Sequence, residues 1–247
     1  MDNALYVGLS RQMLLQQELE ITANNLANAD TIGYKFDDML SSADPVTPTG
    51  SSQVASSPVT FVTSGGVARD YSQGALTTTG SPLDVAIDGK GFFTISTASG
   101  PRYTRDGRFT LDPTGKLVTQ DGDPVEGDGG DITLDPTKGK VAISETGVIS
   151  QAGQQVAKLS VVTFSSLAGL SKAGGNLYSN ESNLTPTPST SASLRQGMLE
   201  SSNVQPIAQI THLIEISRAY DAISSMMSDT ATLSNTAVQK LGAVNPS

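Results

Sequence analysis

The stretch VQPIAQITHLIEISRAYDAISSMMSDTATLSNTAVQKL, residues 204–241, decides the fold class of this chain. Alternate steps of three and four residues define two neighbouring registers along it, and both are rich in apolar side chains. The first register is apolar at seven of ten positions and the second at six of seven, at Ile210, Leu213, Tyr220, Met227, Ala231, Val238 and Leu241, and at Ile216, Ala219, Ile223, Met226, Leu233 and Ala237. This spacing is typical of a coiled-coil seam. It predicts a long helix with two adjacent seams that needs more than one partner, or else a core helix of a globular domain.

A second, weaker helix is predicted near the other end of the chain. Positions 5, 9, 12, 16, 19, 23 and 26 step by fours and threes, and five of the seven are apolar. The helix ends in ANNLANADTIGYK, residues 23–35, where Gly33 supplies a turn. Asparagine is poor inside a helix because its amide competes for backbone groups. Either Asn24, Asn25 and Asn28 cap the helix end, or they bond to a neighbouring chain or to the C-terminal helix, as we expect for at least two of them.

Between the two helices the sequence predicts an antiparallel β domain. Residues 83–87 and 92–95 read as strands on either side of a Gly89–Gly91 turn, and further strands are expected at 116–119, 141–143, 148–150 and 156–164. The Asp106-Gly107 pair predicts a hairpin with a type I′ turn. The fold class is therefore α+β: a central all-β domain with long terminal helices packed as a coiled-coil-like pair.

The expected organisation has five segments. Two stretches that are poor in charge and rich in Ser, Thr and Pro flank the β domain, and we interpret them as connectors in which residues 59–62 could pair as an edge strand. The segments are a helix with an Asn-rich turn (1–40), an extended connector (41–66), the β domain (67–179), a linker (180–193) and a C-terminal segment with the long helix (194–247).

Composition excludes several classes of function. The 247 residues carry 15 basic and 24 acidic side chains, a net charge of -9, and no basic run, so a nucleic-acid partner is not expected. Without cysteine, neither disulfides nor thiolate sites can form. The N-terminal residues MDNA do not resemble a secretory signal peptide, and no 18 consecutive apolar residues predict a membrane span.

Little in the sequence predicts catalysis. Gly89-Lys90-Gly91 stands between two strands, so it lacks the helix start that a phosphate cradle requires. Six acids without a base lie between Asp121 and Asp135, in a spacing that fits a solvated loop better than a calcium site. His212 is the single histidine, and its helical neighbours cannot form a catalytic triad with it. A glycan-active enzyme or a secreted binding module stays a remote alternative, since a sugar cleft usually contains tryptophan and this chain has none.

Several motifs together resemble the bacterial flagellar basal-body rod and hook family. They cover nearly the whole chain: ALYVG (4–8), ANNLAN (23–28), SQGAL (72–76), TGSPLDVAI (79–87), GFF (91–93), YTRDGRF (103–109) and LESSNV (199–204) ahead of the long helix. Within the family, residues 79–87 resemble the proximal rod branch, FlgF, more than the distal rod branch, FlgG, which is the alternative. A hook protein would need a much larger middle.

The resemblance implies a structural subunit with no enzymatic activity and no cofactor or metal. Such a subunit is exported without cleavage through the flagellar export apparatus, polymerises helically through its terminal helices in the rod that crosses the periplasm, transmits torque and lines part of the export channel. Its partners would be itself and other flagellar axial proteins, without nucleic acid or membrane insertion. The expected assembly interface contains Leu5, Leu9, Leu19, Asn24, Asn25, Leu26, Asn28, Thr31, Gly33, Asn203, Val204, Ile210, Leu213, Ile216, Tyr220, Ile223, Met227 and Leu233.

Overall fold

The computed structural model of the protein describes residues 2–46 and 59–242. The middle of the expected connector, residues 47–58, lies outside this range. The described chain forms two compact units. The helical unit takes residues up to Ala27, residues 37–68 and the chain from Gln205 onward, and the β domain takes Asn28–Phe36 and Arg69–Val204.

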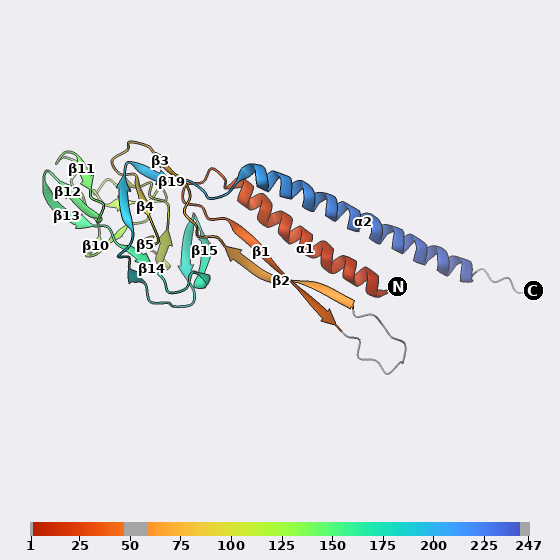
Figure 1. Ribbon diagram of the computed structural model, residues 1–247. Helices are drawn as coiled ribbons and strands as arrows, with labels where there is room; N and C mark the ends of the chain where they lie inside the picture. Colours follow the sequence, from red (N-terminus) through yellow and green to blue (C-terminus); the bar gives the residue numbers. More distant parts are fainter. Residues whose placement is uncertain (1, 47–58, 243–247) are drawn as a thin grey trace, which may run out of the picture. The chain divides into compact units, whose positions relative to one another are not determined.

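The helical unit contains the two predicted helices, α1 (Asp2–Ala27) and α2 (Pro206–Gly242). They lie side by side along most of α1 (Figure 1). Pro206 is the first residue of α2, where its fixed φ and missing N–H suit a helix start. Among the described residues, neither helix combines the length and hydrophobicity needed to cross a bilayer.

The described ends of the expected connector are strands. β1 (Asp37–Val46) and β2 (Val59–Arg69) pair in a two-stranded sheet within the helical unit, beside α1. This differs from an extended, unpaired connector. The β-prone run 59–62 belongs to β2, as the edge-strand interpretation allowed.

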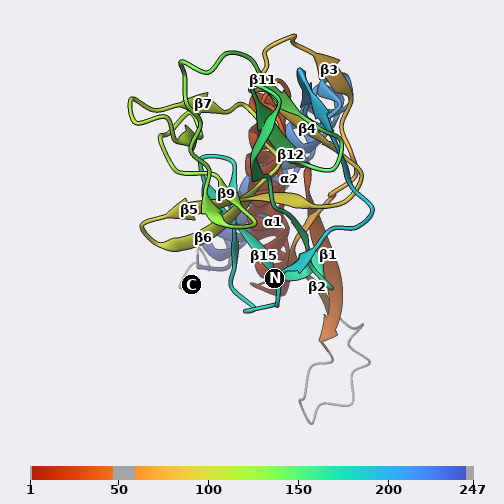
Figure 2. The ribbon, with the colours of Figure 1, turned by 90° about the vertical axis from the view of Figure 1, so that its left-hand side faces the viewer.

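The β domain is built from antiparallel pairs. Its largest sheet has the order β15-β16-β6-β5-β14-β17, with β5 and β6 as a hairpin (Figure 2), and β11-β12-β13 form a second sheet. The pairs β9–β10, β4–β18, β3–β19 and β7–β8 complete it. The remaining elements are β3 (Leu76–Thr78), β4 (Val85–Asp88), β5 (Phe92–Thr97), β6 (Gly100–Thr104), β7 (Thr110–Leu111), β8 (Leu117–Val118), β9 (Glu126–Gly127), β10 (Gly130–Asp131), β11 (Val141–Ile143), β12 (Val148–Gln151), β13 (Gln154–Lys158), β14 (Val161–Thr163), the 3₁₀ turn η1 (Leu167–Gly169), β15 (Leu170–Gly174), β16 (Leu177–Asn180), β17 (Thr187–Pro188), β18 (Ser193–Gln196) and β19 (Met198–Glu200).

The last strands of the domain pair with its first strands. β18 pairs with β4, and β19 pairs with β3. The β domain therefore extends beyond the expected 67–179: it includes strands from the expected linker and C-terminal segment, and residues 28–36 from the expected N-terminal segment. Sequence patterns miss these pieces because the partner strands lie more than a hundred residues away.

The predicted strands at 92–95, 141–143 and 148–150 are confirmed, and the expected strand at 156–164 is divided between β13 and β14. The predicted type I′ turn at Asp106-Gly107 is wrong. Neither residue has a positive φ, and the flanking strands β6 and β7 do not pair with each other. Instead Val85 N donates to Gly107 O at 3.0 Å, and a Cβ on residue 107 would overlap Val85 O. A close approach of two chain segments, rather than a turn, is the reason for this glycine.

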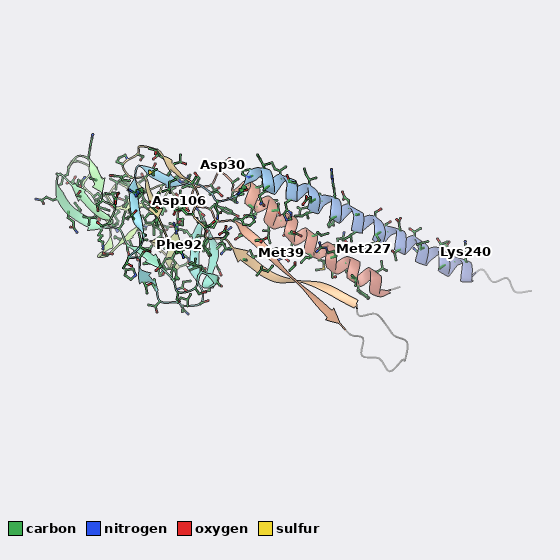
Figure 3. All side chains as sticks on the ribbon, viewed as in Figure 1. Asp30, Met39, Phe92, Asp106, Met227 and Lys240 are labelled. Atoms are coloured by element: carbon green, nitrogen blue, oxygen red, sulfur yellow. The ribbon has the colours of Figure 1, made fainter. Side chains whose placement is uncertain are left out.

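Two apolar clusters form the core of the β domain. One gathers side chains from most strands around Phe93, whose ring lies 5.1 Å from the ring of Phe109. The other is largely aromatic and surrounds Phe92, labelled in Figure 3. Its fully or nearly buried members are Phe92, Tyr103, Val162, Phe164, Leu170 and Tyr178. A core of this size accounts for the order of a domain that is otherwise rich in turns.

Candidate assembly site

The helix α1 buries a stripe that differs from the predicted seam. Leu14 and Leu15 are only 4% and 2% exposed, whereas Leu9, expected in the interface, is 45% exposed. A Cβ on Gly8 would come 3.1 Å from Cγ of Met227, so small residues let α1 approach α2 closely here. Figure 3 shows Met227 on the part of α2 that runs beside α1. Leu5, Leu19 and Leu26 are partly buried.

The helix α2 buries one stripe, not two. It takes members alternately from both predicted seams, because a helix packed along one partner buries only the residues that face it. Gln209 and Ile216 are buried, and Leu213, Tyr220, Ile223, Met227 and Thr230 are partly buried. His212 also belongs to this side, since its Nε2 lies 3.1 Å from Oε1 of Glu18 on α1.

The remaining apolar side chains of the two helices face away from this contact. Ile207 is 83% exposed and Leu233 is 70% exposed, and Ile210 and Met226 are also exposed. Among the helix residues whose burial the structure describes, the exposed large apolar ones are Tyr6, Leu9, Met13, Ile207, Ile210, Ile214, Met226 and Leu233. So many large apolar side chains on two neighbouring helices indicate a surface that another protein covers.

Two amides of the Asn block have partners close by in the chain. Asn25 is 1% exposed and holds the start of β1, since its Nδ2 donates to Asp37 O at 2.7 Å and its Oδ1 accepts from Asp37 N at 3.0 Å. Asn28 Oδ1 accepts from the Thr31 hydroxyl at 3.1 Å. The Asn25 amide therefore has a partner inside the helical unit, and the bonds expected from the Asn block to the C-terminal helix or to a second chain stay a prediction.

The β domain contains a buried group of charges that the sequence did not predict. Glu200, at the end of β19, is 1% exposed and binds two cations. Its Oε1 lies 2.5 Å from Lys35 Nζ, and its Oε2 lies 3.0 Å from Arg105 Nη1. Gly33 and Asn203 form hydrogen bonds between the same chain segments, and we call these five residues together the clasp.

Backbone bonds complete the clasp. Gly33 N donates to Glu200 O at 2.7 Å, and Phe36 N donates to Asn203 Oδ1 at 2.8 Å. The Asn203 amide in turn donates to Asp70 O at 3.0 Å. Gly33 has φ +70°, and a Cβ there would lie 2.7 Å from the backbone carbon of Arg105, so the predicted turn glycine also allows two segments to touch.

Burial is the main influence on the pKa values of the two cations in the clasp. Desolvation lowers the pKa of Lys35 below its usual value, although the attraction and hydrogen bond of Glu200 oppose the shift. Desolvation likewise lowers the pKa of Arg105, again against Glu200. The Arg105 Nη2 also donates to Gly89 O at 2.9 Å, and its guanidinium lies 5.4 Å from the centre of the Phe92 ring. One carboxylate thus compensates two buried cations, which makes Glu200 the residue on which the group depends.

Other polar groups of the β domain have structural partners. Asp128 and Asp131 of the acidic loop pair with Lys158 and Lys116 at 2.9 and 2.8 Å. In the ranges 2–46 and 59–242, no three imidazole or carboxylate groups converge as a metal site would require.

A hollow of about 380 Å³ in the β domain is lined by Tyr34, Asp106, Arg108 and Lys172, among others. Asp106 binds Arg108 at 2.6 Å, and the Lys172 ammonium lies 3.9 Å from the Tyr34 ring centre. These charges are thus engaged within the domain.

The structure separates the expected interface residues into groups. Val204 is buried in the β domain, where Gly33 and Asn203 belong to the clasp and Thr31 binds Asn28. Ile210 and Leu233 stand exposed, and Asn24 is exposed as well. The sequence did not single out Lys35, Arg105 or Glu200, although all three stand inside the quoted motifs. The sequence offered one signal: each of three motifs contains one of these charged residues. Which of them form ion pairs depends on the tertiary structure.

Comparison with known proteins gives three matching family profiles. They are described as a flagella basal body rod protein (residues 5–35), a flagellar hook protein FlgE/F/G D1 domain (residues 86–151) and a flagellar basal body rod FlgEFG protein C-terminal region (residues 195–240). Lys35, Arg105 and Glu200 fall one in each matched range. The clasp therefore joins the three matched segments.

Similar proteins extend over the whole chain. The flagellar basal-body rod protein FlgF of Caulobacter vibrioides is 51% identical over 246 residues, which is 99% of this chain and 100% of that one. FlgF of Mesorhizobium japonicum is 35% identical over 257 residues, covering 98% and 99% of the two chains. The rod protein FlgG of Bacillus subtilis is 34% identical over 253 residues, covering 91% and 93%.

Proposed function

Since this chain belongs to the flagellar basal-body rod protein family, as a rod subunit of the FlgF/FlgG group, we propose that it polymerises through its terminal helices in the proximal part of the rod. In this role it transmits torque and lines part of the axial export channel. The FlgF relatives support the proximal position, and the FlgG relatives support a distal position as the alternative.

One observation carries the proposal: the apolar side chains of α2 that α1 leaves uncovered. Ile207 lies nine residues before the buried Ile216, about half a turn away around the helix at 100° per residue. Ile214 and Ile210 lie about 160° and 120° from Ile216 around the helix, on the same outer side as Ile207. Leaving three isoleucines in water has a free-energy cost that a neighbouring helix would remove.

The arrangement of the inner stripe supports a coiled-coil-like pair. Gln209, Leu213, Ile216, Tyr220, Ile223 and Met227 step alternately by four and three, which is the spacing of a seam that faces one partner. In the proposal, α1 packs against this inner stripe, and a helix of a neighbouring subunit packs against Ile207, Ile210 and Ile214 on the outer side. The helix then has the two partners that its apolar content requires.

The proposed partners are further copies of this chain, the adjoining proximal and distal rod subunits, and the flagellar export apparatus during secretion without cleavage. The rod would cross the periplasm. The role is structural and needs neither catalysis nor a cofactor. What supports this is the set of rod-protein relatives, together with buried charges in the β domain that bind each other.

A triple substitution tests the proposal. Ile207→Ser, Ile210→Ser and Ile214→Ser together should leave the purified monomer folded, because all three side chains are exposed, and should abolish incorporation into rods and swimming. The matched control, Thr211→Ser, Glu215→Ser and Arg218→Ser, changes three exposed residues of the same half of α2 and should assemble normally. Assembly of the isoleucine variant at the parent's level would refute the outer face as an interface.

A further inference from the structure

The clasp lies where the chain passes between the two units. The chain leaves the β domain after Phe36, returns at Arg69 and leaves again after Val204. These three passages adjoin hydrogen bonds inside the β domain: Asp70 N donates to Phe36 O at 2.9 Å, and Asn203 of the clasp links Phe36 to Asp70. The segments that carry the passages are thus tied to one another before the chain leaves the domain.

Without the clasp, the last passage would be held weakly. Among the described residues, the strand β19 pairs with β3 through three residue pairs, and one further backbone bond, from Ser201 N to Ala75 O at 2.8 Å, extends this ladder by one residue. Force applied beyond Val204 loads this ladder at its end, where hydrogen bonds break one after another. A ladder of this length opened from its end offers little resistance.

Glu200 lies one residue before the loaded end of that ladder. Its side chain is bound to Lys35 and Arg105, and Gly74 N also donates to its Oε1 at 2.9 Å. To lift β19, a force must first separate a buried carboxylate from two cations, which is far more costly than breaking one exposed hydrogen bond. Three backbone segments, near residues 35, 74 and 105, then share a load applied to one.

We infer that the clasp is the anchor through which force on the C-terminal passage enters the β domain, so that Glu200 and Asn203 prevent β19 from peeling away. The inference rests on the proposed function for its biological use, since a rod subunit carries torque between its parts. It assigns a mechanical role to three charged residues whose burial otherwise only costs desolvation free energy. It can be tested on the monomer, independently of assembly.

Single-molecule pulling on the full chain provides the test. The chain has no cysteine, so Gly129→Cys and Gln205→Cys give two unique handles, one at an open loop and one just beyond Val204. At constant force we expect Glu200→Gln to raise the rate of the first opening step at least about tenfold. Arg195→Gln on β18 breaks only exposed ion pairs to Asp88 and Glu145 and should change that rate by less than about threefold.

A second variant covers the case in which Glu200→Gln does not fold. Asn203→Ala keeps all three charges and removes the side-chain bonds to Phe36, Asp70 and Ser72, so the domain should remain intact and the opening rate should rise by several-fold. Equal opening rates in the parent, Asn203→Ala and any folded Glu200→Gln would overturn the inference. Failure of the isoleucine variant to lose assembly would leave this result untouched, because the pulling experiment needs no rod.

Discussion

The β domain and the helical unit handle their side chains in opposite ways. In the β domain, Phe93, Val85 and Ile95 are fully buried, and even the charges of Lys35 and Glu200 have partners inside the domain. In the helical unit, apolar side chains such as Ile207 and Leu233 face water. The β domain thus closes on itself, whereas the helical unit has the composition of an interface whose other half is missing from a single chain.

The difference teaches where each part of the molecule obtains its stability. Strands with short ladders gain it from a shared core, which needs no second chain. Two helices in contact along one stripe gain less, since each buries only one side. We expect the β domain to be stable in the monomer and the outer faces of the helices to become ordered contacts in the assembly.

The largest expected effect concerns the core of the β domain. Phe93→Ala should lower the free energy of unfolding by about 3–5 kcal/mol, because it removes a fully buried ring and leaves a cavity. Val156→Ala, at a 45% exposed position of the same domain, should change it by less than about 0.5 kcal/mol. Urea unfolding followed by circular dichroism measures both. Similar values for the two variants would contradict the contrast in burial.

A matched pair on α2 sharpens the comparison within the helical unit. Ile216 is 3% exposed and Ile214 is 45% exposed on the same helix. Ile216→Ala should destabilise the monomer by about 2 kcal/mol, and Ile214→Ala by less than about 0.5 kcal/mol, since alanine also favours helix. Hydrogen exchange of the α2 amides reports the effect on the helical unit alone. Equal effects would mean that the inner stripe is not packed in solution.

Asn25 separates a structural role of the Asn block within the monomer from the predicted intermolecular one. Asn25→Leu should cost about 1–3 kcal/mol, because both backbone groups of Asp37 lose their partner in a buried position. Asn24→Leu, at an exposed position one residue earlier, is the control and should cost less. Thermal unfolding of the monomer measures the difference. If Asn25→Leu left the monomer unchanged and blocked assembly, the amide would belong to an intermolecular contact after all.

The smallest effect is a pH dependence that arises in the clasp. Burial lowers the pKa of Lys35 in the folded protein, so the unfolded chain binds this proton more tightly. The contribution of Lys35 to the free energy of unfolding therefore rises with pH from its lowered pKa up to 10.5 and is constant above that. Lys35→Met removes this rise. Because the unfolding free energy of the parent gains this contribution and that of Lys35→Met does not, the parent-minus-variant difference should increase as the pH rises toward 10.5, and a constant difference would refute the shift.

A deletion of α1 would test whether this helix is needed for assembly, and the unit boundaries determine where the deletion should end. Removing residues 1–35 would take away Gly33 and Lys35 and so damage the β domain together with α1. Removing the chain only as far as Ala27 deletes α1 and keeps the clasp. Loss of swimming with an intact β domain would then report on the helix alone.

The sequence predicted both helices, because an apolar period near 3.6 is a local property that survives in any context. It also predicted the strands around Phe92 and Ile143, which alternate or are bounded by glycine turns. It failed at Asp106-Gly107, where a strong local turn signal gave way to a close approach between Gly107 and Val85. Local patterns specify an element only while no distant segment competes for its backbone.

What the sequence by itself determined is the α+β class, the two apolar helices and the family resemblance, all of which depend on residues near one another in the chain. Only the tertiary structure decided which stripe of α2 is buried, that Asn25 holds β1, and that Lys35, Arg105 and Glu200 meet. Lys35 and Glu200, for example, lie 165 positions apart in the chain. Their pairing depends on which strands lie side by side, and one carboxylate among 24 acids carries no local mark of the two cations it will bind.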